Sequence, residues 1–283
     1  MNGKIKLIAI DLDDTTLGFG AVLAPETEEA IKAAIADGTE IVIASGRAFT
    51  SLPVSVTGIP GIRYAICSNG ATIVSVPDGE RIRAFTLRPE CVFDILRIFE
   101  GELFETFIDG KPFCPDIYYE DPVKYGCSPS YIDYVKTTRT PIHDMPGLIA
   151  DNADRLDSID VLCVTPERKN MLQEKTAELK HVFVTSSAPR LLEISDENAG
   201  KGKALRCLAD MLGIDRESIA AFGNGDNDAD MLSFAGVGVA VANASEHCKA
   251  AADIICESNT ELGVAKTLTR FSDGNAARQS TSE

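Results

Sequence analysis

The chain has 283 residues, of which 45% are hydrophobic and 25% are charged, and its 27 basic and 43 acidic side chains give a formal net charge of −16. This balance is typical of an ordinary soluble globular protein with room for about two domains. The negative charge repels nucleic acid and anionic membrane surfaces, so we expect neither as a partner. An anionic substrate would therefore need a binding site with a positive local potential that overcomes the negative potential of the whole protein.

No apolar run reaches the roughly 18 residues of a membrane span, and the first apolar run is too short and ends too acidically for a secretory signal. The eight cysteines form no CxxC pair, and most of them have apolar neighbours. These observations predict buried thiols in a cytoplasmic protein rather than a disulfide framework.

The first part of the chain alternates short apolar strands with a helix. Strands are predicted at residues 4–10, 40–44 and 64–67. A helix is predicted at 25–37, because Pro25 and acidic residues open it and Gly38 follows its end. Strands that alternate with helices in this way predict a parallel sheet with right-handed crossovers.

The middle of the chain differs, because it holds many of the prolines, most of the tyrosines and strand-like runs separated by long polar stretches. After it, the alternation resumes, with helices at 201–212, 229–234, 246–251 and 263–271, and strands at 218–222, 237–241 and 254–256. We predict one α/β core at 1–84 and 188–271, an inserted α+β domain at 85–187 and a disordered tail at 272–283.

Acidic residues follow the first predicted strand directly. Because side chains alternate along an extended chain, Asp11 and Asp13 can project to one side. Two carboxylates about 4 Å apart repel by about 4 kcal/mol at an effective dielectric of about 20, so a bound cation or a proton would relieve them. The alternative is a solvated acidic turn whose side chains bond to their own backbone.

A second acidic cluster, at 223–230, follows the predicted strand 218–222 and opens a helix. Its glycines permit a tight turn, and its carboxylates and carboxamides are hard oxygen ligands that suit Mg²⁺. A calcium loop is excluded, because Met231 and Val237 occupy the positions that require glycine and glutamate. The alternative, helix capping, would account for one of these acids but not for all of them.

Two further stretches that contain basic residues also follow a predicted strand or open a predicted helix. Ser45, Gly46 and Arg47 follow the second strand and could hold an anion with a hydroxyl and a guanidinium group. Lys201 opens a helix, where a cation is unfavourable unless an anion is held there. The alternative for Ser45, Gly46 and Arg47 is a turn whose sequence arose by chance, and the alternative for Lys201 is a lysine on the protein surface. The phosphate-binding P-loop, the serine hydrolase GxSxG and the HExxH zinc pattern are all missing from the sequence.

Taken together, these stretches resemble the haloacid dehalogenase-like hydrolase superfamily, and specifically its Cof-type phosphatases. The matching motifs are DLDDT at 11–15, SGR at 45–47, KG at 201–202 and GNGDND at 223–228, with NGA at 69–71 in addition. The resemblance covers most of 4–80 and 188–270. It implies a Rossmann-like parallel-sheet core with helices on both faces and an inserted α+β cap domain at 85–187.

The resemblance also implies a role for each motif. Asp11 would be the nucleophile that forms an aspartyl-phosphate, and Asp13 would be the general acid and then the general base. Ser45 and Lys201 would hold the phosphoryl oxygens. The implied Mg²⁺ ligands are Asp11, the Asp13 backbone carbonyl, Asn224 and Asp228. The residues assigned to substrate contact are Thr15, Gly46, Arg47, Asn69, Gly70 and Asn227.

One departure from the family pattern is Asn224, which stands where an acid is usual. A carboxamide can still bind Mg²⁺ through oxygen, but the site loses one negative charge, so we predict weaker binding. The predicted function is a Mg²⁺-dependent phosphatase of small phosphorylated metabolites, above all sugar phosphates. The alternatives are a phosphomutase or phosphotransferase of the same superfamily and a catalytically weak, metabolite-binding regulatory protein. The sequence leaves open whether the chain is a monomer or a dimer.

Overall fold

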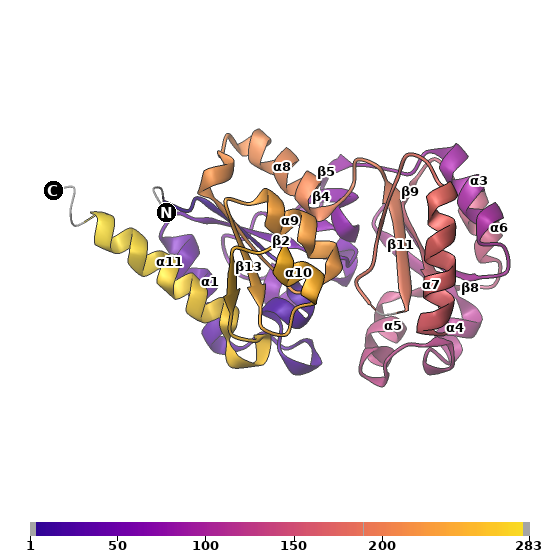
Figure 1. The fold of residues 1–283 in the computed structure, drawn as a ribbon, viewed down its shortest axis with the longest axis horizontal. Helices are drawn as coiled ribbons and strands as arrows, with labels where there is room; N and C mark the ends of the chain where they lie inside the picture. The colour runs from indigo at the N-terminus through magenta and orange to yellow at the C-terminus, as the bar shows by residue number, and fades with distance from the viewer. Residues whose placement is uncertain (1–3, 189, 280–283) are drawn as a thin grey trace.

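The computed structural model describes residues 4–188 and 190–279 and contains two sheets that lie side by side (Figure 1). The strands of the first sheet follow the order β14-β13-β12-β1-β2-β3-β4-β5. Their bounds are β1 Leu7–Ile10, β2 Glu40–Ala44, β3 Tyr64–Cys67, β4 Thr72–Ser75, β5 Arg81–Ala84, β12 Ile219–Gly223, β13 Val237–Val241 and β14 Ile254–Cys256. We call this sheet and its helices the core.

In the core sheet, the neighbouring strands β14, β13, β12, β1, β2 and β3 all run parallel. Strand β1 pairs with β12 on one side and with β2 on the other. All residues of β1, β12 and β13 are buried, as expected for strands covered on both faces of the sheet. Helix α1 packs against α11, and α8 packs against α9 (Figure 1). The core helices are α1 Pro25–Ala36, α2 Val54–Thr57, α8 Lys201–Leu212, α9 Ala229–Phe234, α10 Glu246–Ala250 and α11 Gly263–Gln279.

The second sheet follows the order β10-β11-β9-β6-β7-β8 and is mostly antiparallel. Its strands are β6 Leu103–Ile108, β7 Lys111–Pro115, β8 Thr140–Ile142, β9 Leu156–Leu162, β10 Val182–Thr185 and β11 Leu191–Asp196. Its helices are α3 Pro89–Ile98, α4 Asp116–Glu120, α5 Ile132–Thr138, α6 Met145–Asp151 and α7 Pro166–Lys175. This unit, which we call the cap, has a hydrophobic cluster separate from that of the core.

The predicted fold class, an α/β parallel-sheet core with an inserted α+β cap, is confirmed. Three details differ. Strands β4 and β5 run antiparallel at the edge of the core sheet, because a tight turn at Ser68–Gly70 reverses the chain directly after β3. Strand β11 pairs with β9 and β10, so the cap continues to Asp196 rather than ending at 187.

The third difference is at the C-terminal end, where we predicted a disordered tail at 272–283. Helix α11 continues to Gln279, since alanine, arginine and glutamine at 276–279 favour helix and no proline stops it. Residues 280–283 lie outside the described residues.

Six of the eight cysteines are buried as free thiols, as predicted. Among the described residues, no helix combines the length and apolar character that a membrane span requires.

Candidate active site

The motif residues converge at one edge of the core sheet. Strands β12, β1, β2 and β3 are neighbours and parallel, so their carboxyl ends lie together. Asp11 follows β1, Ser45 follows β2, Asn69 follows β3 and Asn224 follows β12. In open α/β sheets, ligands bind outside this edge of the strands. The topology therefore brings together residues that are far apart in the sequence.

Lys201 joins two of the predicted catalytic and metal-binding carboxylates. Its Nζ lies 2.7 Å from Asp11 Oδ1 and 2.5 Å from Asp228 Oδ1. The side chains of Lys201 and Asp228 are fully buried, and Asp11 is 5% exposed. The first residue of α8 thus places its ammonium group inside the site, which rules out the surface-lysine alternative.

Burial and the neighbouring charges shift the pKa values of Asp11 and Lys201. Burial, together with the charge of Asp228, raises the pKa of Asp11 to about 7, although Lys201 acts in the opposite direction. Burial alone would lower the pKa of Lys201, but Asp11 and Asp228 outweigh it and raise that pKa above its usual value. One ammonium group therefore faces two carboxylates, and a further cation would relieve the excess negative charge.

Asp13 is held by Arg47 in a bidentate ion pair. Arg47 Nε donates to Asp13 Oδ2 at 2.8 Å and Nη2 donates to Oδ1 at 2.6 Å. Arg47 Nη1 donates to the backbone carbonyl of Ser51 at 3.1 Å, and the Arg47 backbone N–H donates to Ser45 Oγ at 3.1 Å. The Asp13 side chain keeps 31% exposure, so it is more accessible than the buried Asp11.

The turn after β12 orients Asp228. The backbone N–H groups of Asn224 and Gly225 both donate to Asp228 Oδ2 at 2.9 Å. A Cβ on Gly223 would lie 2.4 Å from the Asp228 Cβ, so only glycine fits there. Asn224 Oδ1 accepts a hydrogen bond from Thr15 Oγ1 at 2.8 Å. Thr15 therefore contacts the second acidic motif.

The remaining predicted residues lie where the core meets the cap. Asn69 has a left-handed φ of 51°, accepts a hydrogen bond from Asn227 Nδ2 at 2.9 Å, and donates to Glu193 Oε1 at 2.8 Å. A Cβ on Gly46 would approach Asn69 Oδ1 to 3.2 Å, and one on Gly70 would lie 2.3 Å from the Gly200 carbonyl oxygen. These glycines permit close approach of the backbone beside the site.

Sequence reasoning missed two cap residues that contact this site. Glu193, in β11, bonds to Asn69, and Tyr134, in α5, stacks on Arg47 with 4.3 Å between Arg47 Cζ and the ring centroid. An acid within the otherwise apolar run LLEIS was a usable signal for Glu193. Nothing in the sequence distinguishes Tyr134 from other cap tyrosines. Another cap tyrosine, Tyr118 in α4, is buried in a small cap cluster.

A Mg²⁺ ion fits the chemistry of these donors. Lys201 bonds to Asp11 only through Oδ1, so the Asp11 carboxylate keeps acceptor positions for a cation, and the buried carboxylate gains from a nearby positive charge. Within the described part of the chain, no cluster of three or more His, Cys, Asp or Glu side chains is arranged to hold a metal. A Mg²⁺ site here would therefore depend on amide and backbone oxygens beside Asp11. The donor set predicted from the sequence also includes Asp228, whose two oxygens are already engaged by Lys201 and by two backbone N–H groups.

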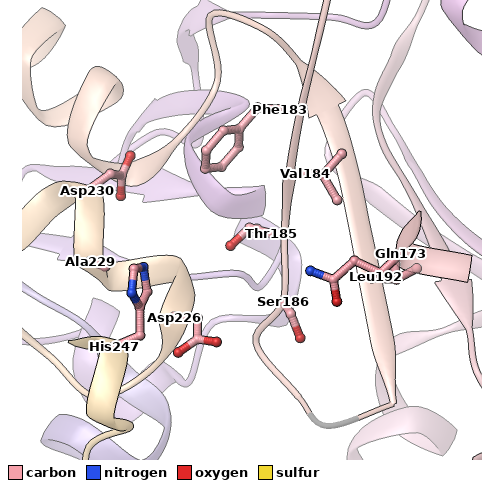
Figure 2. Close-up of a pocket in the computed structure, with 10 residues that line it drawn as sticks. All are labelled: Gln173, Phe183, Val184, Thr185, Ser186, Leu192, Asp226, Ala229, Asp230 and His247. Carbon is pink, nitrogen blue, oxygen red and sulfur yellow. The ribbon is translucent and has the colours of Figure 1, made fainter. Parts of the chain in front are cut away.

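A cavity of about 290 Å³ lies between cap strand β10 and core helices α9 and α10 (Figure 2). Polar side chains from both units line it, and Figure 2 shows Asp226, Asp230 and His247 on the core side facing Thr185 and Ser186 on the cap side. Asp230 also accepts a hydrogen bond from the Gly202 N–H at 2.9 Å, which fixes the start of α8. The junction between core and cap thus contains a hollow that is lined by both polar and apolar side chains.

Comparisons with known proteins agree with this geometry. A family model described as haloacid dehalogenase-like hydrolase matches residues 8–268. The chain is 29% identical to the phosphatase YwpJ of Bacillus subtilis, over 93% of this chain and 99% of that protein. It is also 29% identical to the 5-amino-6-(5-phospho-D-ribitylamino)uracil phosphatase YwtE of the same organism, over 96% and 100%.

A solved structure of a haloacid dehalogenase-like hydrolase from B. subtilis superposes with a TM-score of 0.81 at 29% identity, covering 93% of this chain and 99% of that one. The family resemblance based on the four motifs is therefore confirmed.

Proposed function

Because the chain belongs to the haloacid dehalogenase-like hydrolase family and is a phosphatase of small phosphorylated molecules, we propose that it works through an aspartyl-phosphate on Asp11. The observation that carries this proposal is the buried contact between Lys201 Nζ and Asp11 Oδ1 at 2.7 Å. The contact holds one oxygen of Asp11 and leaves the other free to act. It also stabilises the ionised, nucleophilic form of the carboxylate.

In the first step, Asp11 Oδ2 attacks the phosphorus atom and the bond to the leaving oxygen breaks. The electron pair of that bond stays on the leaving oxygen, which takes a proton from Asp13 after Asp13 has been protonated and has left its ion pair with Arg47. Ser45 donates a hydrogen bond to the phosphoryl group, and Lys201 offsets the negative charge beside it. The products of this step are a free alcohol and a phosphoryl group on Asp11.

In the second step, the ionised Asp13 takes a proton from a water molecule that attacks the phosphorus atom. The bond to Asp11 breaks, inorganic phosphate leaves and the Asp11 carboxylate is restored. Asp13 is exposed enough to meet both the leaving alcohol and the water, whereas Asp11 is buried below it. The difference in exposure supports two different roles for these two acids.

The residues that would hold Mg²⁺ are Asp11, the Asp13 backbone carbonyl and Asn224. Bound there, the ion would supply positive charge to the phosphoryl oxygens. Asp228 has both oxygens engaged, by Lys201 on one side and by two backbone N–H groups on the other. Its role in this account is to orient Lys201 and the turn, or to reach the ion through water.

For the substrate, we propose a sugar phosphate or a related phosphorylated polyol. The hydroxyl and carboxylate groups at the junction of core and cap can hydrogen-bond to a polyol, and one similar relative is named for a phosphoribityl substrate. The cap would close over the site and exclude bulk water. A cytoplasmic location also remains a prediction.

The test is phosphate release by the purified protein from a panel of phosphorylated sugars, polyols, nucleotides and cofactors, with and without Mg²⁺. We expect Mg²⁺-dependent release, with a phosphorylated sugar or polyol as the preferred substrate and no release by Asp11→Asn. A sugar acceptor in the same assay separates hydrolysis from the phosphotransferase alternative, which would form a new phosphate ester. No release from any compound would favour the regulatory alternative.

A further inference from the structure

A groove of about 630 Å³ lies on the core between β5, the last strand of its sheet, and helix α8, and none of the proposed catalytic residues lines it. The charged side chains that line it are Arg83, Lys203, Arg206 and Asp210. Three cations against one carboxylate give the groove a positive local charge, although the formal net charge of the whole chain is −16. A positive hollow in so acidic a protein is suited to an anionic ligand.

Helix α8 supplies most of the groove. The residues that line it recur at intervals of three and four positions, so they share one face of the helix. They are Lys203, Arg206, Cys207, Asp210 and Met211. The opposite face, which includes Leu205 and Leu208, is buried in the core. The helix is thus fixed by its apolar face and presents its charged face to the groove.

The three cations of the groove are held by aromatic rings and not by carboxylates. Within the described part of the chain, none of them lies within ion-pair distance of an acidic side chain. The distances from cation to ring centroid are 4.5 Å for Arg206 Cζ over Phe234, 5.6 Å for Arg83 Cζ over Phe85 and 5.6 Å for Lys203 Nζ over Phe183. A ring face attracts a cation without neutralising its charge, so these charges stay available for an anion.

The groove also adjoins the two connections between core and cap. The chain enters the cap after β5 and returns to the core before α8. Arg83 stacks on Phe85, the first residue after β5. Lys203 donates to the backbone carbonyl of Glu197, the first residue after β11. An anion that binds Arg83 and Lys203 would therefore lie beside both connections.

We propose that this groove is a second binding site, separate from the catalytic one, for a small organic molecule that carries a phosphate group. Guanidinium and ammonium groups form charge-assisted hydrogen bonds to phosphate oxygens. The apolar side chains of Ile82 and Met211, the latter 53% exposed, offer contact surface for the organic part of the ligand. The volume of the groove is in the range of known small-molecule sites. The proposal goes beyond the proposed function and does not depend on turnover.

A cysteine in the groove provides a local readout of binding. Cys207 lines the groove and is partly exposed. Cys127, in the cap, is also partly exposed but does not line the groove, and the other six cysteines are buried. N-ethylmaleimide alkylates accessible thiols, so a ligand in the groove should slow its reaction with Cys207 and not with Cys127. Peptide mass spectrometry gives both rates from the same sample, which makes Cys127 an internal control.

The experiment measures these rates with a chelator present and with three probes: inorganic phosphate, adenosine and α,β-methylene-ADP, a nucleotide analogue without a hydrolysable phosphate ester. We expect a near-saturating concentration of the analogue to slow alkylation of Cys207 by about fivefold or more and to leave Cys127 unchanged. Protection by inorganic phosphate as well would show that the phosphate group alone is sufficient. Equal protection by adenosine, or protection by none of the three probes, would overturn the proposal.

Charge variants assign the protection to the groove. Arg83→Gln and Arg206→Gln should each raise the analogue concentration for half-maximal protection by about tenfold, because each removes a charge-assisted hydrogen bond. The matched control is Arg97→Gln, an exposed arginine of the cap that pairs with Asp94 at 2.9 Å, and it should change that concentration by less than about twofold. An unchanged rate at Cys127 shows that each variant is folded. Half-maximal protection at the parent concentration in both groove variants would show that these cations do not bind the anion, and the proposal would be wrong.

Discussion

Lys201 Nζ and Asp11 Oδ1 lie 2.7 Å apart inside the protein although 190 positions separate the two residues in the sequence. Neither charged side chain would be stable at this buried position without the other, because burial of an unpaired charge costs free energy. The pair exists because Asp11, directly after β1, lies next to the point where α8 begins with Lys201, and because Asp228 supplies a second carboxylate. The pairing thus links the fold to the chemistry of the site.

Replacement of Lys201 tests this link. Lys201→Met leaves Asp11 and Asp228 buried without their cation, so we expect a loss of about 3–5 kcal/mol in the free energy of unfolding. Phosphatase activity should fall by about a hundredfold or more, since the phosphoryl oxygens lose their cation. Denaturant unfolding and kcat/KM measure the two effects. Lys203→Met, an exposed change in the same helix, should leave stability within about 1 kcal/mol of the parent.

The raised pKa of Asp11 predicts a pH dependence of stability. With Mg²⁺ removed by a chelator, the folded protein holds the Asp11 proton up to a pKa of about 7, above the usual aspartate value of 3.8. The native state then binds more protons than the unfolded state between these values, so the contribution of Asp11 to stability falls as pH rises through this range. Asp11→Asn removes this contribution and should melt at a higher temperature than the parent at pH values above about 7.

The measurement is the difference in melting temperature between Asp11→Asn and the parent protein across this pH range. Carboxylates that do not interact with Asp11 titrate in both proteins and cancel in the difference. We expect the difference to grow in favour of Asp11→Asn as pH rises and to shrink when Mg²⁺ is added. A difference that does not depend on pH contradicts the assignment of the shift to Asp11.

Much of this site was predictable because its residues stand at the ends of strands. The positions of Asp11, Ser45 and Asn224 follow from short apolar runs that end in polar residues, and parallel topology brings those ends together. The family resemblance and the cost of a cation at a helix start both implied that Lys201 belongs to the site, but neither implied its full burial.

The cap was less predictable, for a physical reason. Its contacts with the core, Glu193 to Asn69 and Tyr134 to Arg47, depend on how two separate units dock, and local periodicity carries no information about docking. The extent of the cap was also misjudged, because β11 belongs to it only through long-range pairing with β9 and β10. Strand propensity shows that a strand forms, and not which sheet it joins.

Because Asn224 is uncharged, we predict that an acidic residue at this position would strengthen Mg²⁺ binding. Asn224→Asp restores a negative charge beside Asp11 at the metal site, so we expect the Mg²⁺ concentration for half-maximal activity to fall by about five- to tenfold. Calorimetric titration of Mg²⁺ without substrate checks the same change independently of turnover. An unchanged Mg²⁺ dependence would show that Asn224 does not contact the ion.

The bond between Asn69 and Glu193 predicts an effect on substrate binding. Asn69→Ala removes both the bond to Glu193 in the cap and the bond to Asn227 in the core. We expect KM for the preferred substrate to rise by about tenfold, because the cap loses a buried contact that holds it over the site. Glu193→Gln is the milder comparison, since its amide oxygen can still accept from Asn69, and it should raise KM less than Asn69→Ala does. Equal KM values for Asn69→Ala and the parent would contradict this role.

The phosphorylated intermediate on Asp11 is the central claim, and chemical trapping tests it most directly. The protein is mixed with Mg²⁺ and excess p-nitrophenyl phosphate, quenched in acid during turnover, and reduced with borohydride, which converts an aspartyl-phosphate to homoserine. Peptide mass spectrometry should find homoserine at position 11 in the parent protein and in Asp13→Asn, where slower hydrolysis lets the intermediate accumulate, and none in Asp11→Asn. Phosphate release at the normal rate with no modification at position 11 in any sample would contradict the account.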